Sequence, residues 1–222
     1  MFAGLLLVTE HNMKLYVYDH CPFCVRARMA AGLFAPDTEE VVLANDDEAA
    51  PVAMIGAKQV PILEKDDGTF MGESLDIVGY LAQGRLKEDA SPKLQAWLDK
   101  VGEYGNRLTH PRVGKIGLAE FAEPSAVAYF TAKKEKSIGS FNTHLKRTGE
   151  YLTRIGGDLN ALDTLMADEA WDDTVGMKDI LLFPVLRTLT VVRGIEWPLR
   201  IAEYLQRVSE QTGVDLYFDR AL

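Results

Sequence analysis

The sequence predicts two unlike domains, an α/β domain of order βαβ then ββα followed by an all-α domain. Segments rich in β-forming residues cluster in the first third of the chain, and the segments after Pro92 have the periodicity of long helices. With 222 residues, 47% of them hydrophobic, the chain can bury the core of one large or two modest domains. We predict domains over residues 13–84 and 92–222, joined by a polar linker over residues 85–91.

The first three elements form a βαβ unit. The segment MKLYVYDH, residues 13–20, alternates in polarity and is rich in β-forming residues. A segment that favours helix, FCVRARMAAGLF, follows after Cys-Pro, and EVVLA, residues 40–44, is a second β-rich segment. Such a unit normally pairs its two strands in parallel through a right-handed crossover.

The rest of the first domain is predicted to be a short helix, a hairpin and a longer helix. The short helix begins near Pro51. PILE and TFMG are two short apolar segments whose connection contains Asp67-Gly68, a hairpin turn signal. The next helix runs from about Ser74 to Gln83. The polar stretch GRLKEDASP then marks the change to the second domain.

The first twelve residues are predicted to be an extension, from an alternative start or added to the native chain. No basic residue precedes their short apolar run and no small-residue cleavage site follows it, although a signal peptide normally needs both. The run is also far shorter than the roughly 20 apolar residues of a membrane helix. We therefore expect no membrane association.

The charge balance argues against nucleic-acid and membrane partners. Acidic residues number 33 and basic residues 24, so the formal net charge is −9. Such a chain repels phosphate backbones and anionic lipid unless a basic patch intervenes, and the sequence indicates no such patch. It also has no phosphate-binding glycine loop, so we expect no nucleotide cofactor.

The helical domain is predicted from five long periodic segments, and its special residues concern folding. Asp179 can make its half of a capping box, but Gly176 supplies no side-chain acceptor for the other half. Pro184 should bend or locally break its helix. The segment AKKEK, residues 132–136, is interpreted as a solvated helix face. Four aromatic residues are interpreted as core rather than as a ligand wall: Trp97, Tyr104, Trp171 and Trp197.

The two cysteines, Cys21 and Cys24, lie directly after the first strand, in the segment CPFC. With Pro22 as the first helical residue, Cys21 is the helix N-cap, where free N–H groups and the helix dipole stabilise a thiolate. Cys24 lies within the first turn and is more buried. We predict that Cys21 is the exposed nucleophile and that Cys24 is the resolving thiol.

Two other uses of the cysteine pair are less favoured. A disulfide that closes so small a loop restrains little of the unfolded chain. Zinc needs four ligands, and we expect no metal because the usual second pair of ligands is missing among the histidines at positions 11, 20, 110 and 144. Close cysteine spacing in a chain without a disulfide framework favours a reducing compartment, so we expect a cytoplasmic location.

Further candidate residues follow the cysteines. Val60-Pro61 precedes a strand, where a cis bond would leave the Val60 backbone free to pair with an extended peptide, and a trans proline capping an edge strand is the alternative. Glu73 and Ser74 stand at a helix start, where backbone donors bind carboxylates. Lys58 and Arg26 are candidates for a second carboxylate. His20 is a candidate for tuning the thiolate.

Together, CPFC, Val-Pro before a strand and Glu-Ser at the next helix resemble the signature of the glutaredoxins on a thioredoxin fold. The similarity extends further. MKLYVYDHCPFCVRARM, KQVPILEKDDG, ESLDIV and LFPVLRTLTVVRGIEWP, and the whole length after Met13, resemble the glutaredoxin 2 family, larger bacterial glutaredoxins with a glutathione-transferase-like helical domain.

This resemblance implies glutathione as co-substrate, bound in an extended form. Its cysteinyl backbone would pair with Val60 beside Pro61, and its glutamyl carboxylate would lie at Glu73 and Ser74. Its sulfur would meet Cys21. One departure is that this chain has Phe23 where common small glutaredoxins carry Tyr, which removes a hydroxyl but keeps the aromatic wall.

The leading hypothesis is therefore a glutathione-dependent thiol-disulfide oxidoreductase that acts as a monomer on glutathionylated or disulfide-bonded proteins. The first alternative is a cysteine-type glutathione transferase resembling the omega class, against which Cys24 argues. The second is a noncatalytic glutathione-binding or membrane-inserting protein on the same scaffold. Conjugation of an electrophile would distinguish the transferase, and glutathione binding without turnover would distinguish the noncatalytic protein.

Overall fold

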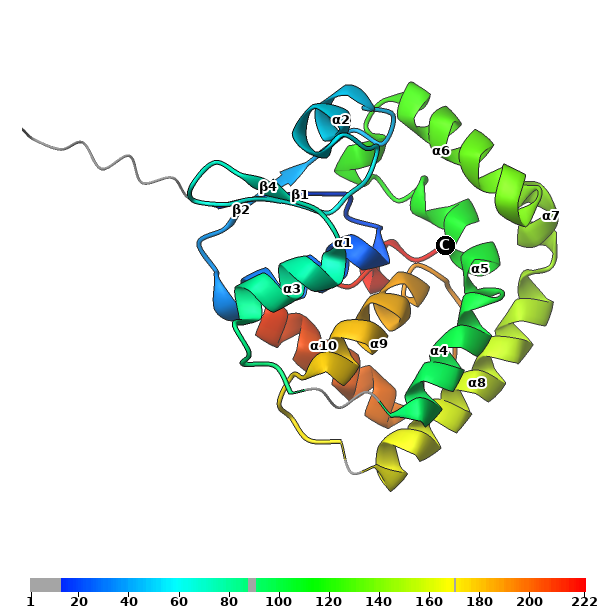
Figure 1. Cartoon of the computed structure of the whole chain (residues 1–222). Coiled ribbons are helices and arrows are strands. Elements are labelled where there is room, and N and C mark those ends of the chain that lie inside the picture. Colours follow the sequence, from blue (N-terminus) through cyan, green and yellow to red (C-terminus); the bar gives the residue numbers. More distant parts are fainter. Residues whose placement is uncertain (1–12, 88–90, 170) are drawn as a thin grey trace, which may run out of the picture.

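The computed structural model describes residues 13–87, 91–169 and 171–222 (Figure 1). The predictions for residues 1–12 and for part of the linker therefore lie outside the described residues. The first domain contains four strands and three helices: β1 (Lys14–Val17), α1 (Pro22–Phe34), β2 (Glu39–Val42), α2 (Ala49–Ile55), β3 (Ile62–Glu64), β4 (Phe70–Met71) and α3 (Ser74–Ala82).

The four strands form one sheet of order β2-β1-β3-β4. β1 and β2 are parallel, with Lys14 opposite Glu39, and β3 runs antiparallel to both β1 and β4. The Lys65 N–H donates to the Thr69 carbonyl across the β3–β4 turn, and Gly68 in this turn has a φ of 77°. The structure thus confirms both the parallel βαβ unit and the hairpin.

The second domain is helical, and in the described part of the chain no strand follows β4. No described helix is long and apolar enough to cross a membrane. The elements of the second domain are α4 (Pro92–Gly102), α5 (Gly105–Val113), η1 (Ala119–Phe121), α6 (Pro124–Ile138), α7 (Phe141–Lys146), α8 (Thr148–Asp168), α9 (Met177–Leu189), α10 (Leu199–Thr212) and η2 (Phe218–Arg220), where η marks a short 3-10 helix.

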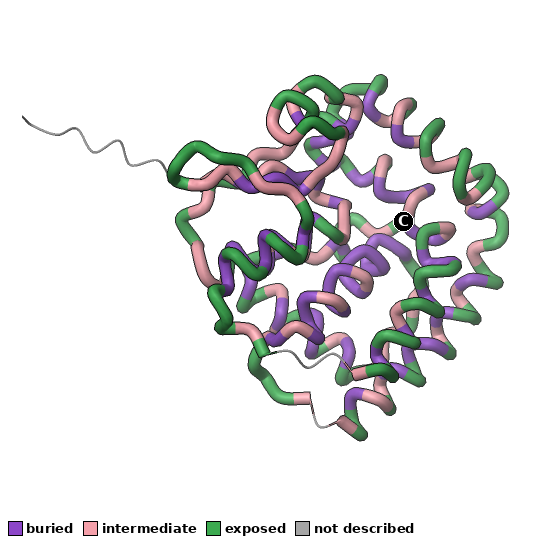
Figure 2. Tube along the Cα trace, viewed as in Figure 1, coloured by how far each residue is buried: buried purple, intermediate pink, exposed green. Residues whose placement is uncertain are grey.

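Helix α1 joins the two domains, because it packs on α3 of its own domain and on α9 and α10 of the helical domain. Figure 2 shows α9 as a predominantly buried helix in the middle of the molecule. The approach of α1 to α10 is very close: a Cβ added at Gly32 would lie 2.0 Å from the backbone oxygen of Thr212. A single apolar core therefore extends through both domains.

The special residues of the helical domain behave in different ways. The Gly176 N–H donates to Asp179 Oδ2 at 2.8 Å, so α9 has the half of the capping box that the sequence predicts. Of the two outcomes predicted at Pro184, the local break is wrong, because α9 continues through this residue to Leu189, and the bend stays a prediction. Pro184 lacks an N–H, and its own carbonyl accepts a hydrogen bond from the Thr188 hydroxyl at 2.8 Å.

Two of the four predicted core aromatics are fully packed. Trp97 and Tyr104 are buried, and both donate a hydrogen bond to Asp158. Trp97 Nε1 donates to the Asp158 carbonyl at 2.6 Å, and the Tyr104 hydroxyl donates to Asp158 Oδ2 at 2.7 Å. Trp171 and Trp197 are only partly buried and pack against neighbouring aromatic rings. A cleft of about 340 Å³ opens beside Cys21, and none of these four aromatic residues lines it.

Candidate active site

The active-site turn lies between β1 and α1. Cys21 is the N-cap of α1 with extended backbone angles, Pro22 is the first helical residue, and the Cys21 carbonyl accepts from Val25 N at 3.0 Å. Proline fits this position because its missing N–H has no intrahelical partner in any case. The local sequence therefore places the Cys21 sulfur at the positive end of the helix dipole.

The two cysteines are free thiols with opposite properties. Cys21 is half-buried and lines a cleft, whereas Cys24 is fully buried and its sulfur accepts the Tyr18 N–H at 3.4 Å. A hydrogen bond from the Cys24 thiol lowers the pKa of Cys21 to about 6 against the opposing effect of burial. The charge of His20 contributes to the same lowering of the Cys21 pKa. Burial raises the pKa of Cys24 well above its usual value, as does its contact with Cys21.

A cleft of about 340 Å³ opens beside Cys21, between the sheet domain and α6. It brings together Cys21, three of the predicted glutathione-binding residues, Phe23, Lys58 and Val60, and His20, the candidate for tuning the thiolate. Phe23 is 53% exposed. Of the second-carboxylate candidates, Arg26 lies elsewhere, with its guanidinium 4.9 Å from the centre of the Phe23 ring. The cleft is therefore the candidate glutathione site.

The Val60–Pro61 peptide bond is cis, as the first of the two sequence readings required. No hydrogen bond within the described part of the chain uses the Val60 backbone. Glu73 and Ser74 stand at the start of α3, with Glu73 as N-cap, but neither lines the cleft directly. The link is Gln59, which lines the cleft and donates from Nε2 to Glu73 Oε1 at 2.7 Å.

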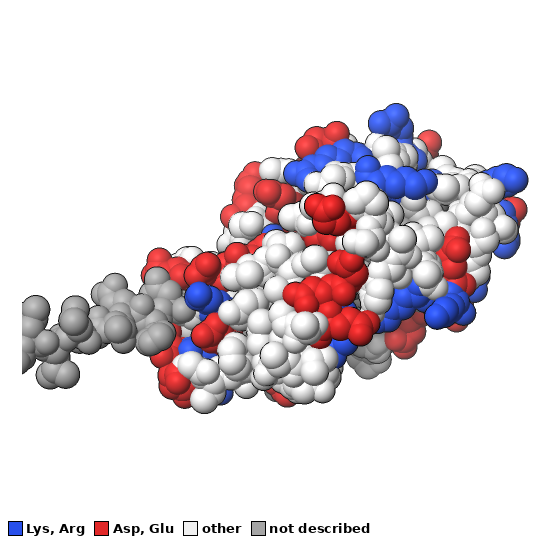
Figure 3. All heavy atoms as spheres, turned by 90° about the horizontal axis from the view of Figure 1, so that it is seen from above, with Lys and Arg blue, Asp and Glu red and all other residues white. Residues whose placement is uncertain are grey.

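Three lysines give the cleft a positive character. The Lys58 ammonium donates to the carbonyls of Asn45, at 3.0 Å, and Asp47. Lys133 and Lys134 reach the same cleft from α6. The interpretation of AKKEK as a solvated face is therefore wrong for Lys134, which is half-buried. Figure 3, which looks down on the α2 and α6 side, shows basic side chains gathered close together among acidic ones.

The spacing of α6 contained a signal for this arrangement. Tyr129, Phe130, Lys133 and Lys134 all line the cleft, and their i, i+4 spacing places them on one helical face. The sequence alone did not show that this face lies opposite the cysteines, because the contact joins residues more than a hundred positions apart.

A second cavity of about 220 Å³ lies between the start of α1 and the helices α4, α5 and α9. Its walls are mostly apolar, and His20 and Phe23 line both cavities. The cavity also contains Arg26 and His110, whose Nε and Nδ1 atoms respectively are buried and have no hydrogen-bond partner among the described residues. The active-site turn thus separates a polar cleft from a more apolar cavity.

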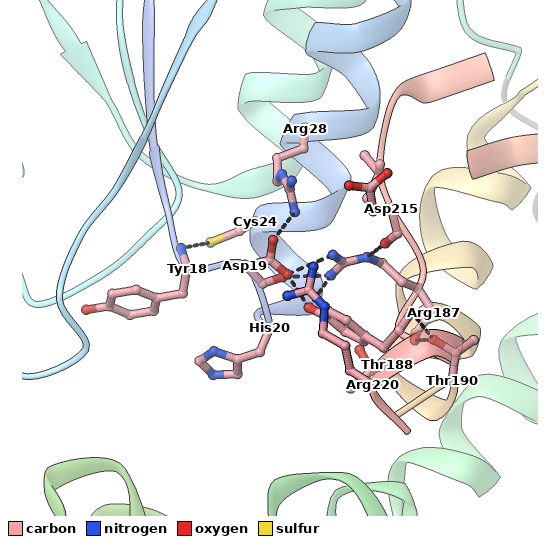
Figure 4. Close-up of polar contacts among 12 residues, drawn as sticks. Tyr18, Asp19, His20, Cys24, Arg28, Arg187, Thr188, Thr190, Asp215 and Arg220 are labelled. Atoms are coloured by element: carbon pink, nitrogen blue, oxygen red, sulfur yellow. Dashed lines mark hydrogen bonds and ion pairs between the residues drawn. The ribbon is translucent and has the colours of Figure 1, made fainter. Parts of the chain in front are cut away.

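A buried charge cluster fixes the residue two positions before Cys21 (Figure 4). Arg187 is fully buried and donates to the Asp19 carbonyl and Oδ1, both at 2.7 Å, and to the Asp215 carbonyl at 2.6 Å. The Tyr217 hydroxyl also bonds Asp19. Burial opposes ionisation of Asp19, but Arg187 and Arg28 hold its pKa at about 2. Helix α9 and the C-terminal segment thus hold the active-site turn.

The described residues contain no group of three or more His, Cys, Asp or Glu side chains that could hold a metal ion.

A dithiol pair at the N-terminus of the first helix, with a cis-proline beside it, defines an oxidoreductase on the thioredoxin fold, here followed by a glutathione-transferase-like helical domain. Comparison of the sequence with models of known protein families agrees with this class of protein. The family model described as Glutaredoxin 2, C terminal domain, matches residues 93–221. The model for the glutathione S-transferase N-terminal domain matches residues 15–85.

Whole-chain relatives identify the family. Glutaredoxin 2 of Escherichia coli K12 is 44% identical over 215 residues, which cover 95% of this chain and 100% of that protein, and the same figures hold for the strain O157:H7 protein. The crystal structure of glutaredoxin 2 from Salmonella typhimurium in complex with glutathione superposes with a TM-score of 0.90 at 44% identity, covering 96% of this chain and 100% of that chain. This chain belongs to the glutaredoxin 2 family and is a glutathione-dependent oxidoreductase.

More distant structures share the fold alone. A glutathione transferase from Phanerochaete chrysosporium covers 94% of this chain and all of its own, with a TM-score of 0.61 at 17% identity. The likeness confirms the predicted architecture of a thioredoxin-like domain followed by a helical domain.

Proposed function

We propose that the protein reduces mixed disulfides between proteins and glutathione, and protein disulfides, with Cys21 as the nucleophile. The observation that carries this proposal is the difference between the two thiols: Cys21 lines the cleft with a lowered pKa, and Cys24 is buried with a raised one. A thiolate attacks a disulfide sulfur, and a pKa near or below ambient pH keeps the attacking sulfur ionised. Cytoplasmic location and action as a monomer are part of the proposal.

The reaction on a glutathionylated protein needs one cysteine. The Cys21 thiolate attacks the glutathione sulfur of the mixed disulfide, the protein thiolate leaves and takes up a proton, and glutathione remains bonded to Cys21. A second glutathione, as its thiolate, attacks that glutathione sulfur. Oxidised glutathione leaves, and the Cys21 thiolate is restored.

A protein disulfide also uses the second cysteine. Attack by Cys21 on one sulfur releases the other as a thiolate and leaves a mixed disulfide with Cys21. Cys24 then loses its proton and attacks the Cys21 sulfur, which releases the second protein thiol and leaves the Cys21–Cys24 disulfide. Two glutathione molecules reduce this bond and leave as oxidised glutathione.

Several features support glutathione in the cleft. The free backbone of Val60 beside Pro61 offers a donor and an acceptor to an extended peptide. The start of α3 at Glu73 and Ser74 offers backbone donors to a carboxylate. Lysines 58, 133 and 134 complement the negative charge of glutathione. The Salmonella typhimurium relative was solved in complex with glutathione.

The test is glutathione-dependent release of glutathione from a glutathionylated peptide. We expect turnover by the wild type and by Cys24→Ser, and none by Cys21→Ser. On a protein disulfide, Cys24→Ser should be slower than the wild type. Absence of turnover by the wild type on both substrates would overturn the proposal.

A transferase activity is the second candidate, and the apolar cavity beside the active-site turn is the observation that favours it. An electrophile in this cavity would lie close to the same turn. Conjugation of a model electrophile with glutathione at a rate above that of thiol exchange would favour this candidate. The buried Cys24, which conjugation does not need, argues against it.

A further inference from the structure

The helical domain places a fully buried carboxylate against the residue before the nucleophile. Glu120, in η1, has no exposed surface, and its Oε1 accepts from the His20 backbone N at 3.0 Å. The same oxygen lies 2.8 Å from His20 Nδ1. Glu120 is 100 positions from His20 along the chain, and His20 directly precedes Cys21.

The Glu120 backbone makes a second contact with the sheet domain. Its carbonyl accepts the Asn45 N–H at 2.9 Å. The Asn45 carbonyl in turn accepts from Lys58 in the cleft. One residue of the helical domain therefore fixes two loops of the sheet domain, one carrying the nucleophile and one bordering the cleft.

The position of this carboxylate is explained by its charge partner. A carboxylate without exposed surface is costly unless it is paired and hydrogen-bonded. Both hydrogen bonds between His20 and Glu120 are made by Oε1 of the carboxylate. The other oxygen, Oε2, has no hydrogen-bond partner among the described residues. An imidazole that carries protons on both nitrogens forms an ion pair here, and its positive charge stabilises the neighbouring thiolate.

The imidazole is held on its faces as well as at Nδ1. Its ring stacks with Tyr18 at 6.0 Å between centroids and contacts Phe121 at 5.0 Å and Phe130 at 5.1 Å. This aromatic surround, built from both domains, gives the ring few other polar partners. The orientation of the imidazole therefore depends on Glu120.

Other charged and titratable groups face the same turn. Arg26 on α1 and Lys134 on α6 are the other cations that interact with Cys21, and Cys24 is its thiol partner. His110 on α5 faces His20. Glu120 also interacts with Tyr217 of the Asp19 cluster, but both of its side-chain hydrogen bonds are to His20, which directly precedes Cys21.

We propose that Glu120 is a positioning residue for the oxidoreductase reaction, which acts through His20 on the reactivity of the Cys21 thiolate. The helical domain thereby completes the active site of the sheet domain. The inference rests on the proposed role of Cys21 as nucleophile. Alkylation of Cys21 needs no turnover, so a failure of this inference is visible separately from a failure of the proposed function.

The experiment measures the rate of Cys21 alkylation by iodoacetamide between pH 4 and 9, with the modified residue identified by mass spectrometry. The variants are Glu120→Gln, His20→Gln and the double variant. Glutamine at position 120 keeps an acceptor for both His20 bonds and removes only the charge. Glutamine at position 20 keeps a donor that cannot be charged. Glu123→Gln, at an exposed glutamate three residues on, is the matched control.

We expect Glu120→Gln to raise the midpoint of Cys21 alkylation by about one pH unit, which is about tenfold slower alkylation well below the midpoint. His20→Gln should raise it similarly, the double variant should add nothing, and Glu123→Gln should match the wild type. Circular dichroism checks that each variant is folded. An unchanged or lowered midpoint in folded Glu120→Gln would overturn the inference, because loss of a negative charge acting directly on Cys21 lowers the midpoint. A further rise in the double variant would also overturn it.

Discussion

The two sides of the active-site turn are built in different ways. The side proposed for glutathione takes Val60, Pro61 and Ser74 from neighbouring segments of the sheet domain, and the lysines of α6 face them across the cleft. The other side is held by the helical domain: Glu120 bonds His20 across 100 positions, and Arg187 bonds Asp19 across 168. The comparison teaches that the sheet domain carries the nucleophile and that the helical domain sets its surroundings.

The two contacts with the helical domain also differ from each other. Arg187 is fully buried and satisfies its donors on Asp19, Tyr217 and a backbone carbonyl. The pair of His20 and Glu120 lies directly before the nucleophile, and the charge of His20 lowers the pKa of Cys21. We therefore expect the contact of Arg187 with Asp19 to determine the stability of the fold, and the contact of Glu120 with His20 to determine the reactivity of Cys21.

The largest effect is expected at Arg187. Arg187→Met leaves Asp19 and the Tyr217 hydroxyl without their buried partner and should lower the free energy of unfolding by about 3–5 kcal/mol. Arg200→Met removes an exposed ion pair with Asp163 and should cost no more than about 1 kcal/mol. Unfolding in guanidinium chloride at pH 7 measures the free energy of unfolding of both variants. Equal losses would show that the cluster is not a special support of the turn.

The close approach of α1 and α10 predicts the next effect. Gly32→Ala places a Cβ against the Thr212 carbonyl and should destabilise the protein by about 1–3 kcal/mol or more, as overpacking does. Gly79→Ala is the matched control, because this exposed helical glycine has nothing within 4 Å of an added Cβ. The control should stabilise the protein by about 0.5–1 kcal/mol. Thermal unfolding of the two variants should therefore shift in opposite directions.

Acid should weaken the Asp19 contact. Its pKa of about 2 lies below the ordinary value of 3.8, so its carboxylate contributes stability above about pH 4 that is lost as pH falls towards 2. The contribution is about 2 kcal/mol. Unfolding of the wild type and Asp19→Asn between pH 6 and 2 should show the wild type losing this amount more than the variant. Parallel pH profiles would contradict the assignment.

The smallest effect on stability is expected on the glutathione side. Ser74→Ala should raise the KM for glutathione by about fivefold to tenfold, the value of one hydrogen bond, with a stability change of no more than about 1 kcal/mol. Ser125→Ala, at an exposed serine of α6, is the control and should leave the KM unchanged. A KM that is the same in both variants would remove Ser74 from the proposed site.

The same comparison explains what the sequence predicts. The parallel βαβ unit, the hairpin, and Cys21 as N-cap all follow from local propensity and turn chemistry. The cis bond at Pro61 was one of two readings that the sequence left open. The Salmonella relative supports glutathione binding, while the individual contacts of Val60, Glu73 and Ser74 stay a prediction.

The sequence did not predict the contributions of the helical domain. Glu120 and Arg187 are single charged residues within helical segments, and such residues are usually solvated. Lys134 was assigned to a solvent-facing run for the same reason. Their roles depend on how two domains pack, which is a long-range property that local spacing does not contain. The local break predicted as one outcome at Pro184 does not occur, because tertiary packing overrides a local propensity.

The pH dependence of alkylation of both cysteines in the reduced wild type distinguishes the roles assigned to the two thiols. We expect Cys21 to be alkylated with a midpoint near pH 6, so its reactivity rises from pH 5 to 7 and is lost below pH 5 as the thiolate is protonated. Cys24 should stay unmodified up to about pH 9 while the protein is folded, because it is buried and its pKa is raised. Equal alkylation of the two cysteines, or a Cys21 midpoint at the free-thiol value of about 8.5, would contradict the account.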